Sequence, residues 1–374
     1  MHKIEAFKIV ANKLNGKSVN WAVGASFLLY LKGIIQEFND FDLMIDVKDI
    51  KPAQDIFEQL GQAQQETFNH HFKSDFFKAY LFDGIEFDII AGFRIINNQE
   101  HYFLFKKATE HFDLDGIDVP LDSLSNWMYY YQLMNRPAKA KLICDYYGHQ
   151  LNDYLFAQRQ DNILKYQQHV LKDENLPIIG IGIPKLRKIA KKIVCEDFDF
   201  FMQINQHLTF ENVLLEGLVI GYYRTDLNEK LRLIDRYLPL IENWEICDTF
   251  VATLKFETNE KQQVFNFIKR YLNSSNPYAI RFSLVMMLYY YIDNVHFEDI
   301  LITIKTIKSK NYYVEMALAW LLSMMYLKNP KRIIDYLNKH YLNDSVYNKT
   351  LQKICESTQV DENTKQYLKN LKIK

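Results

Sequence analysis

The pattern of apolar and polar residues changes character near residue 148. Before that point, runs that alternate like strands are mixed with segments of helical periodicity. After it, every periodic segment has the spacing of an amphipathic helix. The sequence therefore predicts a multidomain protein, with an α+β domain over residues 1–148 followed by an all-α domain over 149–374. A chain of 374 residues is long enough for each domain to bury a core.

The first domain is expected to alternate short strands with helices. Its predicted elements are a strand at 19–23 with a turn at Gly24-Ala25-Ser26, a helix from 27, a strand at 41–47, a helix at 50–60, strands at 76–82 and 85–91, and helices from 121 and from 138. The Asp83-Gly84 pair between two alternating runs is typical of a β-hairpin turn. These elements would form one small mixed sheet with helices packed on it.

The second domain is expected to contain helices of about 15–20 residues, repeated at intervals of roughly 35–40 residues. Prolines break the pattern between them, at Pro177, Pro184, Pro239, Pro277 and Pro330. Stacked helical pairs of this kind predict a right-handed, HEAT-like α-α superhelix, whose curvature would provide a concave face.

Charge and cysteine content narrow the function classes. Residues 151–374 carry 30 Lys and Arg against 26 Asp and Glu, whereas residues 1–150 carry 15 against 20. This asymmetry favours a polyanionic partner for the second domain, although a solvated surface explains it equally well. The four cysteines are far apart and show no zinc-ligand spacing. With no signal-peptide core and no apolar run long enough to span a bilayer, we expect a soluble, cytoplasmic protein without membrane partners.

Acidic residues in the first domain suggest a metal site. Asp40 and Asp42 lie two apart at a predicted strand, so their side chains share a face, and Asp88 lies on a later strand. Three such carboxylates can hold one or two divalent ions and clamp a triphosphate. The small residues Gly24 and Ser26, at a strand-to-helix turn, would let backbone N–H groups approach phosphate oxygens.

This segment, residues 18–145, resembles the nucleotidyltransferase superfamily, and the stretch from Asn135 to Lys139 belongs to the resemblance. The resemblance implies Mg²⁺ and a nucleoside triphosphate as candidate cofactors. Ala25 stands where the family has a second glycine, and Glu37-Phe38-Asn39 replaces a basic or hydroxyl residue. A domain that keeps the fold without the activity therefore stays open.

Two tryptophans, an acid and a base mark the second domain. Trp244 and Asp248 lie four apart, on one face of a predicted helix, and Arg281 and Trp320 follow on later helices. Two indoles can flank a flat cation through their π faces. Asp248 can stabilise positive charge that develops on a sugar, and Arg281 can hold a backbone phosphate. An Asp–Arg pair of this kind is, however, more often a bridge that stabilises the repeats. We expect the four residues to meet in one groove.

Together with an upstream hydrophobic-Gly-x-x-x-Pro-x-x-Arg stretch at 178–187, these residues resemble the AlkD-like DNA alkylation repair family of HEAT-repeat glycosylases, over about residues 155–370. The resemblance implies excision of positively charged N-alkylated purines, such as 3-methyladenine and 7-methylguanine, from duplex DNA without a cofactor. It assigns Asp248, Trp244 and Trp320 to catalysis and Arg281 to DNA binding. Ser323 stands where active members carry a further arginine, and Tyr166 is a candidate for a third aromatic.

Basic residues cluster on the helix after Pro184. Lys185, Arg187 and Lys188 are predicted DNA contacts, although an exposed amphipathic helix explains them equally well. Two alternatives to excision stay open: a non-excising DNA- or damage-binding protein, and a metal-dependent nucleotidyltransferase that works through the first domain. The sequence is silent on the oligomeric state.

Overall fold

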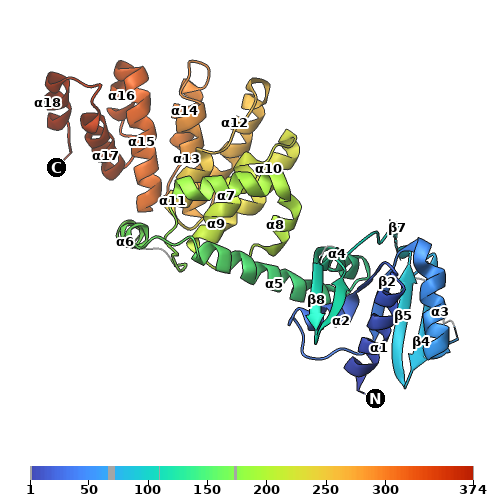
Figure 1. Cartoon of the computed structure of the whole chain (residues 1–374). Coiled ribbons are helices and arrows are strands. Elements are labelled where there is room, and N and C mark those ends of the chain that lie inside the picture. The colour runs from blue at the N-terminus through green and yellow to red at the C-terminus, as the bar shows by residue number, and fades with distance from the viewer. Residues whose placement is uncertain (1, 66–71, 109, 172–174, 374) are drawn as a thin grey trace. The chain divides into compact units, whose positions relative to one another are not determined.

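The computed structural model describes residues 2–65, 72–108, 110–171 and 175–373, and the chain divides into two compact units, Met1–Leu151 and Asn152–Lys374 (Figure 1). The boundary falls inside one long helix, α5 (Pro137–Phe156). The boundary predicted from the sequence, between residues 148 and 149, lies within the same helix. The order of an α+β unit followed by a helical unit confirms the predicted fold class.

The first unit is built on a seven-stranded mixed sheet with the order β3-β4-β5-β2-β1-β9-β8, and a separate hairpin pairs β6 with β7. The strands are β1 (Trp21–Val23), β2 (Phe41–Ile45), β3 (Gln62–Ala63), β4 (Phe76–Phe82), β5 (Ile85–Ala91), β6 (Phe93–Asn97), β7 (Gln99–Phe103), β8 (Glu110–Leu114) and β9 (Ile117–Leu121). Strand β2 runs parallel to β5, and β1 runs parallel to β9. The central strands β1, β2 and β5 carry most of the buried apolar residues of the sheet, so the core surrounds them.

Helices cover this sheet. They are α1 (Lys3–Gly16), α2 (Ala25–Leu31), α3 (Ile50–Leu60) and α4 (Leu124–Leu133), with a 3-10 turn η1 (Val47–Asp49). Helix α1 packs on α3 and β9, whereas α2 packs on β2 and α4. Aromatic rings fill the core beneath α1, where Phe7 lies 5.0 Å from Phe41 and 4.7 Å from Phe27, centroid to centroid.

The predicted strands and helices up to residue 91 are present, but the sequence pattern missed the four strands from β6 to β9. Strands β7 and β8 are largely exposed, so they carry little of the alternation that marks a half-buried strand. Two non-glycine turn residues, Asn98 and Asp115, adopt positive φ of 57° and 53° and close the β6–β7 and β8–β9 hairpins. Turn chemistry at Asp115-Gly116 was the available signal.

The second unit consists of helices that alternate between two rows (Figure 1). They are α6 (Asp161–Val170), α7 (Ile183–Glu196), α8 (Phe198–Ile204), α9 (Phe210–Tyr222), α10 (Leu227–Tyr237), α11 (Trp244–Val251), α12 (Lys261–Lys269), α13 (Pro277–Tyr290), α14 (Phe297–Ile304), α15 (Tyr312–Lys328), α16 (Pro330–Leu337), α17 (Asp344–Glu356) and α18 (Glu362–Asn370), with 3-10 turns η2 (Leu238–Leu240), η3 (Thr258–Glu260) and η4 (Arg270–Asn273). In the first row, α7, α9, α11, α13, α15 and α17 each pack on the next member. Helices α8, α10, α12, α16 and α18 pack on helices of that row.

The expected helix length of 15–20 residues was wrong, since α7 to α18 run from 7 residues in α8 to 17 in α15. Capping residues fix where several of these helices begin, at positions that the apolar pattern does not mark. Asparagine side chains accept backbone N–H groups at the starts of four first-row helices, at Asn243, Asn276, Asn311 and Asn343. The apolar periodicity therefore continues across short loops that separate distinct helices.

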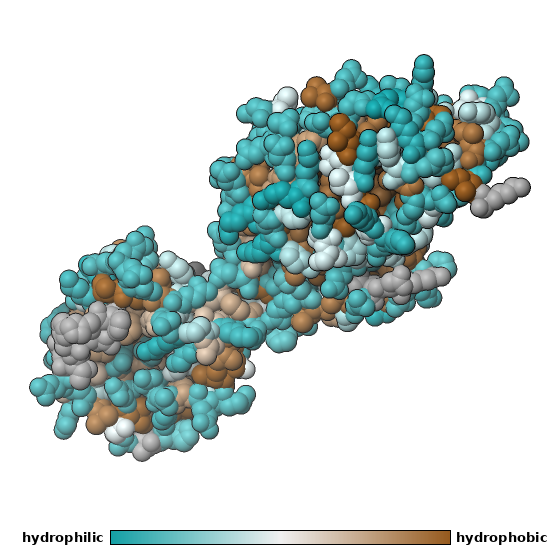
Figure 2. All heavy atoms as spheres, turned by 180° about the vertical axis from the view of Figure 1, so that it is seen from behind, coloured by the Kyte–Doolittle hydropathy of each residue, from teal (hydrophilic) through white to brown (hydrophobic). Residues whose placement is uncertain are grey.

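The molecular surface is mostly hydrophilic on the face that Figure 2 shows, with apolar residues in separate patches. Large exposed apolar side chains are correspondingly scattered along the chain rather than grouped in one segment. Among the described helices, none combines the length and apolar character needed to cross a lipid bilayer.

Candidate functional site

The helical unit brings Asp248 and Arg281 into direct contact. Arg281 Nε donates to Asp248 Oδ1 at 2.9 Å, and Nη2 donates to Oδ2 at 2.7 Å, which is a bidentate pair between α11 and α13. Its Nη1 donates to the Tyr313 carbonyl at 2.8 Å. Burial lowers the pKa of Arg281, but the bonds and charge of Asp248 outweigh burial, so that the pKa lies above its ordinary value. Arg281 was predicted to contact DNA; here all three of its side-chain nitrogens bond within the protein.

The two tryptophans lie on helices next to this pair. Trp244 is the first residue of α11, one turn before Asp248, and Trp320 lies on α15; both are half-buried. The Trp320 ring meets Tyr289 of α13 edge to face, with centroids 6.3 Å apart at 88°. The four predicted residues thus lie on three consecutive first-row helices, α11, α13 and α15. Tyr289, which is 46% exposed, is an aromatic neighbour that the sequence reasoning missed.

Ser323, which stands where active members of the resembled family carry an arginine, does not face solvent. Ser323 is buried, and its hydroxyl donates to the Trp320 carbonyl at 2.7 Å. Tyr166, the candidate third aromatic, is 62% exposed on α6. Helix α6 precedes α7, and among the residues that the structure describes, Tyr166 has no recorded ring contact with either tryptophan.

The predicted basic residues of α7 differ in their surroundings. Arg187 donates to the Tyr222 hydroxyl at 2.8 Å and to the Thr253 hydroxyl at 2.9 Å, so it ties α7 to α9 and to the end of α11. Lys188 is exposed, and Lys185 is half-buried. The two lysines are thus the members of the predicted set that remain at the surface, whereas Arg187 has a structural role in this arrangement.

A buried carboxylate explains the Gly-x-x-x-Pro stretch before α7. Glu211 of α9 is fully buried and accepts from the backbone N–H groups of Ile179, Gly180 and Ile181 at 2.9, 2.7 and 3.1 Å. Gly180 has φ +97°, and a Cβ there would overlap Leu164. This loop therefore requires glycine and a buried acid, and it fixes where α7 begins.

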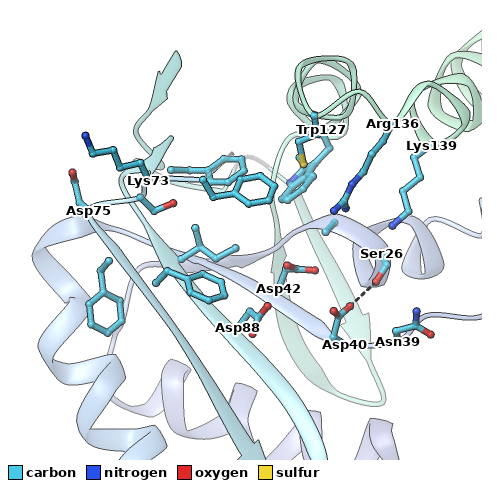
Figure 3. Close-up of a pocket in the computed structure, with 18 residues that line it drawn as sticks. Ser26, Asn39, Asp40, Asp42, Lys73, Asp75, Asp88, Trp127, Arg136 and Lys139 are labelled. Atoms are coloured by element: carbon cyan, nitrogen blue, oxygen red, sulfur yellow. Dashed lines mark hydrogen bonds between the residues drawn. The ribbon is translucent and has the colours of Figure 1, made fainter. Parts of the chain in front are cut away.

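The first unit contains a cavity of about 760 Å³ (Figure 3). Its lining contains acidic, basic and aromatic side chains: Ala25, Ser26, Asn39, Asp40, Asp42, Phe72, Lys73, Ser74, Asp75, Phe76, Phe77, Asp88, Ile90, Phe93, Trp127, Met134, Arg136 and Lys139. All three predicted metal-site carboxylates and the predicted phosphate-site serine line it.

The carboxylates are brought together by strand pairing. Asp42 of β2 lies opposite Asp88 of β5 in a parallel register, and Asp40 precedes β2. Burial, with the charges of Asp40 and Asp88, raises the pKa of Asp42 to about 8. Burial, with the charges of Glu86 and Asp40, raises the pKa of Asp88 to about 7. Both acids therefore hold their protons more tightly than an exposed carboxyl does, and a nearby positive charge would favour their ionised forms.

The turn before α2 is narrow because of Trp127. A Cβ on Gly24 would overlap the Trp127 ring, so glycine is needed for close packing. Ala25, where the resembled family has glycine, adopts φ +42°, in the left-handed region that alanine disfavours. Ser26 donates from its hydroxyl to Asp40 Oδ1 at 3.3 Å. The backbone thus keeps a glycine-like conformation without the second glycine.

Two cavity cations were not singled out from the sequence. Arg136 and Lys139 line the cavity at the start of α5, and both lower the pKa of Asp42 through their charge. Figure 3 shows both side chains extending from the helix toward the carboxylates and Ser26. The Asn135 to Lys139 stretch was the available signal, but only the fold shows that it faces Asp42.

The cavity carboxylates suit a cation that is bound partly by the protein and partly by the phosphates of a ligand. Asp88 Oδ1 is buried and has no hydrogen-bond partner among the described residues, a deficit that a cation or a proton would satisfy. Within the described ranges, no three His, Cys, Asp or Glu side chains are grouped so that they could hold a metal ion by themselves. Mg²⁺ is usually bound by one or two carboxylates together with substrate phosphates, so Asp42 and Asp88 fit such a shared site.

Comparisons with known proteins separate the two units. Residues 151–354 match the family described as DNA alkylation repair enzyme. No curated protein matches the chain.

Similar solved structures align with about two fifths of the chain. A protein assigned as a nucleotidyltransferase from Thermotoga maritima is 20% identical, with TM-score 0.32, over 41% of this chain and 91% of that one. Two structures of the antibiotic-resistance factor ANT(2″)-Ia are each 14% identical, with TM-score 0.29. The one in complex with adenylyl-2″-tobramycin is covered to 94%, over 41% of this chain, and the solution structure to 98%, over 45%. At these values they assign no activity.

Proposed function

This chain belongs to the DNA alkylation repair enzyme family, and we propose that its helical unit is a DNA glycosylase that excises positively charged N-alkylated purines from duplex DNA. The observation that supports this most is the Asp248 carboxylate, held by Arg281 between helices that present Trp244 and Trp320. We infer that the two rows of helices form a HEAT-like superhelix of the AlkD type. The substrates would be bases such as 3-methyladenine and 7-methylguanine.

The chemistry follows from the charge of the substrate. An N-alkylated purine is already cationic, so it leaves the sugar as a neutral base and needs no protonation. The sugar gains positive charge as the bond breaks, and a carboxylate aimed at it lowers the energy of that state. Asp248 keeps an exposed side, because its side chain is 17% exposed against 7% for Arg281. Each carboxylate oxygen accepts one bond from Arg281 and retains a second lone pair for a water or the sugar.

The indoles are placed to recognise the cation. Trp244 and Trp320 are both half-buried, so each presents part of its surface to solvent. A flat cation attracts the π face of an indole by about 0.5–2 kcal/mol. The edge-to-face contact with Tyr289 holds the Trp320 ring in one orientation. The three residues would favour a cationic lesion over a neutral base.

Arg281 is buried and uses three of its five N–H donors inside the protein, so we look to exposed lysines for phosphate contacts. Lys308 and Lys310 are exposed and directly precede α15. Tyr313, whose carbonyl accepts a bond from Arg281, comes three residues after Lys310. Lys310 therefore lies within roughly 10 Å of that carbonyl. We infer that these lysines, with Lys185 and Lys188 of α7, contact the DNA backbone.

The test is base release from methylated duplex DNA by the purified full chain. We expect release of 7-methylguanine above the spontaneous rate, and a loss of at least about a hundredfold in Asp248→Asn, which removes the charge and keeps the shape. A wild-type rate equal to spontaneous depurination would disprove excision. If such a protein still bound DNA with a salt-dependent affinity, the non-excising damage-binding function would replace it.

The cavity of the first unit favours a second candidate function, metal-dependent nucleotidyl transfer. Arg136 and Lys139 line the same cavity as Asp42, and their positive charges act on its carboxyl. Basic side chains suit the negative phosphates of a triphosphate, and carboxylates suit the cation that accompanies it. When bound, Mg²⁺ would neutralise phosphate charge and be held by Asp42 and Asp88, with Asp40 next to them. Gly24 and Ser26 would border the phosphates at the start of α2.

Nucleotide incorporation tests this candidate. The full chain, incubated with labelled nucleoside triphosphates and Mg²⁺, should transfer label to an acceptor in a cell extract or to itself. Asp40→Ala should abolish the transfer, whereas Asp118→Ala, an exposed acid of β9, should not. Failure of wild-type protein to bind any nucleoside triphosphate would exclude this activity.

A further inference from the structure

Aromatic side chains line one part of the cavity in the first unit, hereafter called the aromatic part: Phe72, Phe77, Phe93 and Trp127. Phe93 stacks on Trp127 with ring centroids 6.1 Å apart at 28°, and Phe72 stacks on Phe93 at 6.2 Å and 20°. The three rings line the cavity, although Phe93 and Trp127 are only 4% and 2% exposed. Phe77 of β4 also lines the cavity and is 41% exposed, so a large part of its side chain is open to a ligand.

Positively and negatively charged side chains also line the cavity near the aromatic part. Asp75 accepts from the Tyr102 hydroxyl at 2.6 Å and from Arg94 Nη2 at 2.7 Å, and Lys73 lies two residues earlier along the chain. Figure 3 shows Lys73 and Asp75 on one side of the carboxylates, and Ser26 and Lys139 on the other. With Arg94 paired also to Glu100 at 2.6 Å, the positive and negative charges at this end balance.

We propose that this aromatic part binds the base of a nucleoside triphosphate whose phosphates would lie at Arg136 and Lys139. The inference rests on the proposed nucleotide function of the cavity and adds the orientation of the ligand and the residues that hold its base. A nucleobase is flat, uncharged and edged with both donors and acceptors. The balanced charges of Lys73 and Asp75 suit such an edge better than they suit a polycation, which would need a net negative wall.

The size of the cavity agrees with a whole nucleotide. Sites for small molecules and cofactors commonly enclose about 300–1,000 Å³, and 760 Å³ is more than a metal ion and three phosphates need. The remaining space is the part lined by Phe72, Phe77, Phe93 and Trp127. Every nucleobase has a flat π face, so aromatic side chains can stack on any of them. Aromatic residues at this position therefore predict affinity for all four bases.

The test separates the two ends of the cavity by two probes. ATP contains a base and phosphates, whereas inorganic tripolyphosphate has only the phosphates, and both are titrated calorimetrically into the full chain with Mg²⁺. We expect Phe77→Ala to weaken ATP about tenfold or more and to leave tripolyphosphate unchanged. Lys139→Ala should weaken both. Phe77→Trp keeps a stacking ring and should keep ATP affinity, and Tyr129→Ala, an exposed ring of α4 outside the cavity, is the matched control.

The outcomes distinguish this inference from the function it rests on. Wild-type protein that binds neither probe overturns the nucleotide function of the cavity altogether. ATP binding that survives Phe77→Ala, or ATP and tripolyphosphate weakened alike, overturns the base site alone. Because Phe77 is well exposed, its variants should fold, and unchanged tripolyphosphate binding by Phe77→Ala confirms that they do.

Discussion

Asp248 and Arg281, 33 residues apart in the sequence, share two hydrogen bonds of 2.9 and 2.7 Å across neighbouring helices, and a third bond extends the arginine to the Tyr313 carbonyl. The pair joins α11, α13 and α15 at the position where the proposed chemistry occurs. We therefore expect Arg281 to orient the carboxylate rather than to bind the substrate.

Removal of Arg281 should destabilise the helical unit strongly. Arg281→Met leaves Asp248 partly buried without its partner, at a cost of about 3 kcal/mol in the free energy of unfolding. The double variant Arg281→Met/Asp248→Asn should recover part of this loss, because the unpaired charge is gone. Urea denaturation of the four proteins in a double-mutant cycle measures the coupling. Losses that simply add would show that the pair contributes nothing as a pair.

The salt dependence of DNA binding should identify the phosphate contacts. The double variant Lys308→Gln/Lys310→Gln should reduce the slope of log affinity against log salt by about 1–2, since each phosphate contact contributes roughly 0.9. Fluorescence anisotropy with a labelled duplex measures the slope. Lys331→Gln/Lys339→Gln, two exposed lysines of and after α16, should leave it unchanged. Arg281 variants that stay folded should also keep the wild-type slope, and a reduced slope would place Arg281 on the DNA.

The Tyr289 ring should support excision through Trp320. Tyr289→Ala removes the edge-to-face contact at 6.3 Å, and we expect base release to slow by about two- to tenfold. Tyr289→Phe keeps the ring and should keep the rate. Single-turnover release of 7-methylguanine measures both, with Tyr341→Ala, another exposed tyrosine, as control. If Tyr289→Phe slowed base release as much as Tyr289→Ala, the tyrosine hydroxyl rather than the ring would support excision.

Substitutions at two adjacent positions of the turn before α2 should change the stability of the first unit in opposite directions. Gly24→Ala forces a Cβ into Trp127 and should cost about 1–3 kcal/mol of stability. Ala25→Gly relieves a left-handed alanine at φ +42° and should gain up to about 1 kcal/mol. Thermal unfolding of the first unit's transition measures both. A destabilised Ala25→Gly would mean that the alanine side chain contributes packing worth more than the strain.

Lys230 should make the stability of the helical unit depend on pH. It is buried on α10, donates to the carbonyl of Ile220 at 2.6 Å and to that of Tyr223, and burial lowers the pKa of its amine to about 8 from an ordinary 10.5. Above pH 8 the unfolded chain retains a proton that the folded chain has lost, so stability rises with pH, by about 2 kcal/mol at pH 9.5.

Replacing that lysine tests the pH effect. Lys230→Met should show a flatter profile between pH 7 and 9.5 in urea denaturation, whereas Lys331→Met, at an exposed position, should keep the wild-type rise. A wild-type profile that is flat or falling over this range would contradict the prediction.

Local features were predictable because they depend on neighbouring residues. The alternation at Phe76–Phe82 and Ile85–Ala91 around Asp83-Gly84 indicated a hairpin, and the structure confirms it. Helix α3 spans Ile50–Leu60, as its amphipathic pattern indicated. The exposed strands β7 and β8 were missed because exposure removes the apolar alternation on which such a prediction depends.

The sequence by itself determined the order of an α+β and an all-α domain, and it placed Trp244, Asp248, Arg281 and Trp320 on helices of the second. Periodicity and capping residues act over a few positions, so they can be read from the chain. Only the tertiary structure decided that Arg281 bonds to Asp248 and that Lys139 faces the Asp42 cavity. Partners of charged side chains are set by the packing of distant segments, where burial makes an unpaired charge costly and selects the neighbour that compensates it.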